Sequence, residues 1–187
     1  MRTDISEKLV HLTKGSGINV ALHRQMAFKT LGEIMKSESI KGGTGFIKGL
    51  HKCVCFSEAP ISMLSNILSI KTGSGFKYQP YGVMVSKKWI YDMGGRPVIY
   101  GPESEYAKLP EEMKFRHVRF EIDGGSSIDF TSEREWRIQT DELKFTHDDV
   151  TIIVPDRRAK NAFVKKFTSQ PWHYIVLSDL GVSIEAL

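Results

Sequence analysis

The apolar residues of this chain fall in short segments that glycine-rich or polar stretches separate. Short segments rich in β-branched and aromatic residues are typical of strands, whereas spacings of three and four residues indicate helices. Strands are predicted over 9–13, 53–56, 81–85, 97–100, 116–122, 135–138, 150–154 and 174–177, and helices over 28–35, 60–68, 86–93 and 156–167. Because strands and helices do not alternate strictly, the sequence predicts an α+β fold.

Length and composition indicate one compact unit. The 187 residues and 21.2 kDa match an ordinary domain that buries a hydrophobic core. Apolar residues make up 41% and charged residues 26%, which is typical of a globular chain rather than a disordered one. With no repeat and no linker of distinct composition, a single domain over residues 1–187 is predicted.

Cysteine content, hydropathy and charge favour a cytoplasmic protein. Cys53 and Cys55 are too few for a disulfide framework, which fits a reducing compartment. The N-terminal segment is polar and no apolar run approaches the length of a membrane span, so no membrane association is expected. Lys and Arg (26) exceed Asp and Glu (22) by four, which permits an anionic partner without requiring one.

Several familiar nucleotide, metal and hydrolase motifs are absent from the sequence. Gly15-Ser16-Gly17 lacks the third glycine of a dinucleotide-binding fingerprint, and no glycine-rich stretch ends in Gly-Lys-Ser/Thr. Cys53 and Cys55 have no zinc-spaced partners, the six histidines form no H-E-x-x-H, and no G-x-S-x-G is present. These motifs give no support to Rossmann, P-loop, zinc or triad chemistry.

Polar residues instead occur inside two predicted strands. In SEREWR, period-two alternation predicts Glu133, Glu135 and Arg137 on one face of an extended segment. That face either lines a site or belongs to an exposed edge strand with alternating charges. In LVHLT, His11 is either a hydrogen-bonded core histidine or part of a pocket wall.

The order of these segments resembles a family of abortive-infection proteins. LVHLT, a glycine-rich turn, CVCFSEAP, YGVMVSKKWIYDMGGRPVIY, EREWRI and VTIIVP together look like the AbiGi-type family, over most of residues 8–155. More distantly, the same order resembles the ADP-ribosyltransferase fold of DarT-like toxins, which use NAD as substrate. This resemblance implies split mixed β-sheets flanked by helices.

The resemblance also implies a set of site residues. Enzymes of that fold carry a His or Arg on the first strand, an aromatic residue or Ser on a middle strand, and a Glu, often within Glu-x-Glu, on a later strand. His11 matches the first position and Glu135 the third, with Glu133 as the auxiliary acid. Tyr81 is the first candidate for the middle position and Phe56-Ser57 is the alternative, although the chain lacks a Ser-Thr-Ser triplet.

The implied chemistry is cleavage of the nicotinamide–ribose bond. Positive charge develops on the ribose, and the Glu135 carboxylate would stabilise it while Glu133 orients or deprotonates the acceptor. The other predicted contacts are His11 with a ribose hydroxyl, Thr13 with the nicotinamide amide or phosphates, Tyr81 stacked on nicotinamide, and Arg24 with the pyrophosphate. Thr13 as an ordinary strand residue, Tyr81 as core and Arg24 as a solvated helix residue remain alternatives.

Basic residues indicate nucleic acid as the acceptor. They form two groups, and aromatic residues are interleaved with the first, which suits single-stranded RNA or DNA. The groups are Lys41, Lys48, Lys52, Lys71, Lys77, Lys87 and Lys88, and then Arg157, Arg158, Lys160, Lys165 and Lys166. A solvated lysine-rich surface is the alternative. The resemblance to toxins also implies a neutralising antitoxin protein as partner.

Two other classes of function stay open. A metal-dependent nuclease would use Asp129, Glu135 and Arg137 as a carboxylate cluster followed by a cation. A non-enzymatic, antitoxin-like binding module is the second alternative, because the AbiGi-type family is associated with that role.

Overall fold

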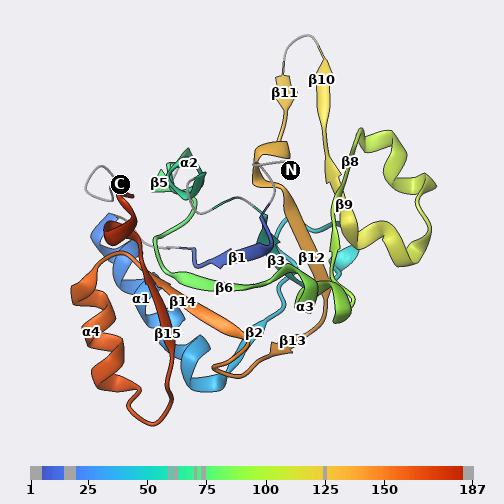
Figure 1. The fold of residues 1–187 in the computed structure, drawn as a ribbon. Coiled ribbons are helices and arrows are strands. Elements are labelled where there is room, and N and C mark those ends of the chain that lie inside the picture. Colours follow the sequence, from blue (N-terminus) through green and yellow to red (C-terminus); the bar gives the residue numbers. More distant parts are fainter. Residues whose placement is uncertain are drawn as a thin grey trace.

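The computed structural model describes residues 6–14, 20–58, 60, 63–69, 71–72, 75–123 and 126–182, and its fold is α+β (Figure 1). A seven-stranded sheet forms the centre, in which β14 and β15 are parallel and the other neighbours are antiparallel. Its order is β15 (His173–Val176), β14 (Val150–Val154), β6 (Gly82–Ser86), β1 (Lys8–Leu12), β3 (Cys53–Ser57), β12 (Glu135–Gln139) and β7 (Arg96–Pro97).

Smaller strand pairs surround this sheet. They are β2 (Ser39–Lys41) with β13 (Glu142–Lys144), β4 (Lys71–Thr72) with β5 (Gly75–Phe76), β8 (Ile99–Gly101) with β9 (His117–Arg119), and β10 (Glu121–Asp123) with β11 (Ser126–Ile128). The β10–β11 pair projects away from the body of the protein (Figure 1). Single 3-10 turns are η1 (Lys48–Leu50), η3 (Glu103–Lys108), η4 (Glu111–Arg116), η5 (Thr131–Glu133) and η6 (Leu177–Leu180).

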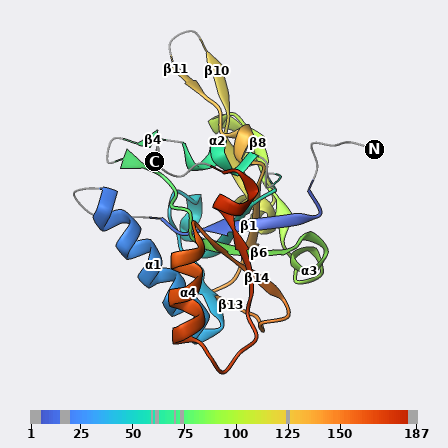
Figure 2. The same ribbon diagram turned by 60° about the vertical axis from the view of Figure 1, so that its left-hand side comes forward.

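Helices cover the two faces of the sheet unequally. The long helix α1 (Val20–Ser37) and α4 (Arg157–Lys166) pack on one face, here called the α1 face. The shorter α2 (Leu64–Leu68) packs with η6 on the other, here called the α2 face, and both views agree on this arrangement (Figures 1 and 2). A short helix α3 (Lys87–Asp92) follows β6 directly. Apolar side chains of the inner strands point alternately to the two faces, so each face has its own core.

Local sequence explains several of these elements. The Asp156 side chain accepts a hydrogen bond from Ala159 N at 2.7 Å and so caps α4. At the start of β6, a Cβ on Gly82 would lie 2.2 Å from the carbonyl oxygen of His11. Glycine at this position therefore allows β6 to approach β1 closely.

The join between β1 and β3 is short. The two strands pair at one position, Val10 with Ser57, whereas β1 pairs with β6 at five and β3 with β12 at five. Next to that position, the His11 side chain bridges the two strands in place of a backbone hydrogen bond. Its Nδ1 lies 2.8 Å from the Cys55 carbonyl oxygen and donates to it. The sheet is continuous, but its two halves meet at this narrow join.

The structure confirms most of the predicted strands on each side of this join. The predicted strand 97–100 is divided between β7 and β8, which belong to different sheets, and the predicted strand 116–122 is divided into β9 and β10. The prediction that Glu133, Glu135 and Arg137 share one strand face is wrong for Glu133, which lies in η5. Arg134 has φ 43°, in the left-handed region, so the chain turns there and period-two alternation begins only at Glu135. Strand β12 also lies between β3 and β7 and is not an edge strand.

No helix within the described part of the chain has both the length and the apolar character needed to cross a membrane.

Candidate functional site at the start of β12

The segment from η5 into β12 brings the two predicted acids, Glu133 and Glu135, next to the end of β3. Glu135 lies directly opposite Ser57 in the strand register. The Ser57 hydroxyl donates a hydrogen bond to the backbone carbonyl of Glu133 at 2.5 Å. Ser57 therefore contacts the segment that carries both acids, as the Phe56-Ser57 alternative for the middle position would require.

Glu133 is held by two side chains from the segment before β6. Its carboxylate accepts from Lys77 Nζ at 2.5 Å and from the Tyr78 hydroxyl at 3.0 Å. The carboxylate is nearly buried, with 11% of the side chain exposed. Burial raises the pKa of Tyr78 and the neighbouring Glu133 charge raises it further, so Tyr78 remains a donor at neutral pH. Both oxygens of the Glu133 carboxylate are thus bonded within a cluster with Lys77 and Tyr78.

Glu135 is oriented by a buried arginine. Arg137 Nε lies 2.8 Å from one carboxylate oxygen and its Nη2 lies 3.2 Å from the other. The same guanidinium donates to the Phe115 and His117 carbonyls, so its position is determined from two directions. Burial raises the pKa of the Cys55 thiol, and the Glu135 carboxylate, to which it hydrogen-bonds, raises it further.

A pocket of about 300 Å³ opens beside Glu135. Its lining combines two carboxylates, two aromatic rings and one guanidinium with small residues: Glu58, Pro97, Val98, Tyr100, Thr131, Arg134, Glu135 and Trp136. The Tyr100 hydroxyl accepts from the Glu135 backbone N–H at 3.3 Å and donates to the Phe130 carbonyl at 3.2 Å. Burial raises the pKa of Tyr100. The ring is thus fixed in the pocket wall as a neutral phenol.

Glu58 supplies the second acid of this pocket. One of its oxygens accepts from the Trp136 indole N–H at 2.8 Å, and the other lies 3.1 Å from Lys87 Nζ. Trp136 points to the α1 face while Glu135 points to the α2 face, because neighbouring residues on a strand alternate. The pocket therefore lies at the end of the strand, where residues from both faces meet.

The structure does not bring His11 to this pocket. His11 is opposite Val83 and contacts the Phe56 ring at 5.8 Å, so it points to the α1 face. Glu135 shares the register row of Val10 and Ser57 and points to the α2 face. Burial lowers the pKa of His11, which favours a neutral ring that donates to Cys55.

Thr13 and Tyr81 lie together at the opposite end of β1. The Thr13 hydroxyl and backbone N–H both donate to the Tyr81 carbonyl, at 2.9 and 2.8 Å. The Tyr81 side chain is buried in the core and contacts the Phe28 ring edge-on at 5.9 Å. Burial raises the pKa of Tyr81, and Arg24 of α1 is near enough to oppose this rise. These three predicted NAD contacts form a group apart from Glu133 and Glu135.

Sequence reasoning missed several residues of the pocket and its surroundings. Glu58 directly follows the apolar strand CVCF and Ser57, and this change to polar residues was a usable signal. Tyr100 and Tyr78 carried no such signal, and Lys77 was predicted only as part of a basic surface, because the partners of these residues lie 30 or more positions away.

The first predicted basic group is neutralised by acids. Six of its seven lysines form ion pairs: Lys41 with Glu142, Lys48 with Glu103, Lys52 with Asp141, Lys77 with Glu133, Lys87 with Glu58 and Lys88 with Asp92. The side chain of the seventh, Lys71, lies outside the described residues. In the second group Arg157 pairs with Asp179.

The residues of the nuclease alternative do not form a ligand cluster. Asp129 accepts hydrogen bonds from the backbone N–H and the hydroxyl of Thr131, and Glu135 forms an ion pair with Arg137. Over the ranges that the structure describes, no three His, Cys, Asp or Glu side chains are placed to hold one metal ion.

Comparison of this chain with protein-family models, with curated proteins and with solved structures gives no match.

Proposed function

We propose that this protein cleaves the nicotinamide–ribose bond of NAD and transfers ADP-ribose to nucleic acid. The observation that carries the proposal is the pocket whose lining includes Glu135 and Glu58 together with two aromatic residues and Arg134. Carboxylates stabilise a sugar cation, aromatic rings stack on a planar leaving group, and a guanidinium suits a pyrophosphate.

Each residue has a defined part in this reaction. The C1′–N1 bond breaks, and its electron pair leaves with neutral nicotinamide. Glu135, oriented by Arg137, stabilises the positive charge that develops on the ribose. An acceptor nucleophile then bonds to C1′, and its proton passes to Glu58, the other acid in the pocket lining. Glu133 supports the site through Lys77 and Tyr78.

The other residues predicted to contact NAD do not line this pocket. His11 points to the opposite face from Glu135, and Thr13 and Tyr81 bond to each other at the far end of β1. Roles for His11, Thr13, Arg24 and Tyr81 in NAD binding remain predictions from the resemblance. A neutralising antitoxin protein belongs to the same resemblance and is proposed on that basis.

The test is incubation of the full chain with NAD labelled in the adenylate, together with RNA, single-stranded DNA or cell lysate. We expect nicotinamide release and transfer of label, reduced about 10²- to 10³-fold in Glu135→Gln, as for loss of one preorganised electrostatic contact. Glu142→Gln is the matched control and should match wild type, because Glu142 is a partly exposed acid on β13 that pairs with Lys41.

Melting curves of both variants show whether the fold is intact. Wild-type protein that neither releases nicotinamide nor transfers label would remove the proposal and favour a binding module. Full activity in a folded Glu135→Gln variant would also contradict it, because the carboxylate would then have no part in the reaction.

A further inference from the structure

A second pocket lies at the opposite edge of the main sheet, between β15 and the end of α4. It has a volume of about 290 Å³ and is lined by Val164, Phe167, Thr168, Gln170, Pro171, Trp172 and Tyr174. Four strands separate β15 from β12, which puts this pocket roughly 24 Å from Glu135 at the usual strand spacing. It is therefore a separate site.

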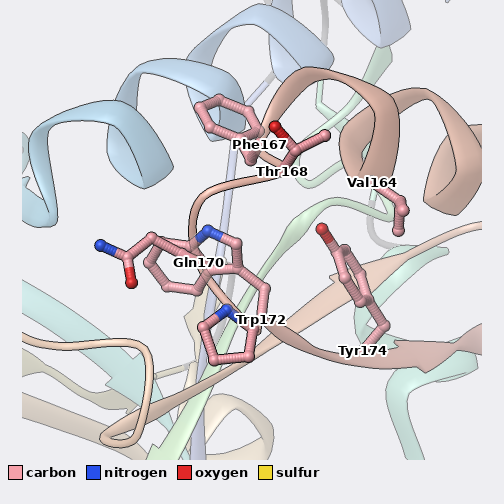
Figure 3. A pocket seen from close by; sticks show the side chains of 7 residues that line it. Val164, Phe167, Thr168, Gln170, Trp172 and Tyr174 are labelled. Carbon is pink, nitrogen blue, oxygen red and sulfur yellow. The ribbon is translucent and has the colours of Figure 1, made fainter.

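Three of its seven lining residues are aromatic. Figure 3 shows Trp172 and Tyr174 side by side below the end of α4, with Phe167 on the far side of the space between them. Trp172 is held in place because it is 7% exposed and its ring contacts Phe145 edge-on at 6.3 Å. Such rings provide a platform on which a planar ligand can stack.

Two hydrogen-bond donors at the pocket have no partner. The Trp172 indole N–H and the Tyr174 hydroxyl are buried, and no group in the described residues bonds to either. In Figure 3 the hydroxyl points up toward α4, into the region that Val164 and Thr168 border. Buried donors without partners are rare, because each costs about 1–3 kcal/mol. A ligand with a carbonyl or ring-nitrogen acceptor in this region can bond to the Tyr174 hydroxyl.

Two lysines of α4 lie next to aromatic rings of the same pocket. Lys160 Nζ lies 5.9 Å from the Tyr174 ring centroid, and Lys166 Nζ lies 5.4 Å from the Phe167 ring centroid. Neither ammonium has a carboxylate within ion-pair distance among the residues that the structure describes, unlike six lysines of the first basic group. These cations are therefore available to an anionic ligand.

We propose that this pocket binds a nucleotide, with the base stacked between Phe167, Trp172 and Tyr174 and the phosphate facing Lys160. The volume is at the small end of ligand pockets, about 300–1,000 Å³, and suits one base rather than a dinucleotide. The source is either a free mononucleotide or one nucleotide of a single strand. The inference goes beyond NAD cleavage and does not depend on it.

The test titrates the full chain with AMP and UMP by calorimetry, and with dye-labelled oligoadenylate RNA and DNA by fluorescence anisotropy. Lys160→Met should weaken binding about five- to tenfold, as for loss of one phosphate contact. Val164→Glu, at a pocket residue that is 45% exposed, should weaken it at least as much by charge repulsion. Lys165→Met, on the same helix but not placed over an aromatic ring of the pocket as Lys160 is, is the matched control.

Two binding patterns would support the proposal, and two would overturn it. Mononucleotide binding that Lys160→Met weakens and Lys165→Met spares supports a free nucleotide, and the same pattern with oligonucleotides alone supports a single strand. No binding by any of these ligands at millimolar concentration would overturn the proposal. Equal losses in Lys160→Met and Lys165→Met would also overturn it, because only the general charge of α4 would then be involved.

Discussion

The start of β12 and the far end of β1 both contain buried polar side chains, but these are satisfied in different ways. At β12 the groups are charged and satisfy one another, as in Glu135 with Arg137 and Glu133 with Lys77. At β1 they satisfy the backbone, as in Thr13 with the Tyr81 carbonyl. A side chain that bonds to the backbone has a structural task, whereas a paired charge beside a pocket can also meet a ligand.

The largest expected effect tests the charged region. Arg137→Met should lower the free energy of unfolding by about 3–5 kcal/mol, because it leaves Glu135 nearly buried without its partner and frees two backbone carbonyls. Urea unfolding followed by circular dichroism measures the change. Arg119→Met, which breaks the exposed pair with Glu121, is the control and should cost less than about 1 kcal/mol. Equal losses in the two variants would mean that burial does not distinguish these pairs.

An intermediate effect concerns His11. Burial lowers its pKa in the folded chain, so the unfolded chain takes up a proton first as the pH falls below about 6.5. The stability that neutral His11 contributes is therefore present above this pH and is lost below it, by at most about 1.4 kcal/mol per pH unit. Burial also lowers the pKa of His117, which acts in the same direction.

His11→Asn keeps a donor for the Cys55 carbonyl but cannot titrate, so its unfolding free energy should fall less than that of wild type between pH 7.5 and 5.5. Wild type and His11→Asn with the same pH dependence would show that the ring does not remain neutral. His173→Asn, at an exposed position, controls for loss of a histidine.

The smallest effect concerns Thr13. Thr13→Val removes one buried hydrogen bond to the Tyr81 carbonyl, which still accepts from the Thr13 backbone, and should cost about 1 kcal/mol. Thr13→Ser keeps the hydroxyl and should be closer to wild type in thermal melts. NAD cleavage should be unchanged in both variants. A selective loss of NAD cleavage in Thr13→Val would mean that Thr13 takes part in the reaction. The far end of β1 would then share the function of the pocket at the start of β12.

The elements of the fold were predictable because they depend on local pattern. Strands such as Val150–Val154 and the helix that begins after Asp156 follow from β-branched runs and a capping side chain. One feature was not predictable in this way. The turn at Arg134 has a left-handed backbone at a residue other than glycine, and nothing in SEREWR indicates it.

The site was predictable only in part. Glu135 stood out because a carboxylate at the start of an apolar strand is unusual, and the structure puts it in a pocket wall. The face to which His11 points depends on which residue of β1 meets Ser57, and register of this kind is set by tertiary packing. The number of lysines was equally ambiguous as a sign of a nucleic-acid surface, because the spacing of residues in the sequence does not show which distant acids pair with them.

The single pairing of Val10 with Ser57 has a mechanical consequence. Between the β15 side and the β12 side of the sheet, the backbone pairing is reduced to one rung, which one imidazole contact supplements. The core under α1 nevertheless contains side chains from both sides of this join, such as Val83 of β6 and Phe56 of β3. Side-chain packing, more than backbone hydrogen bonding, therefore holds the two pocket-bearing edges of the sheet together.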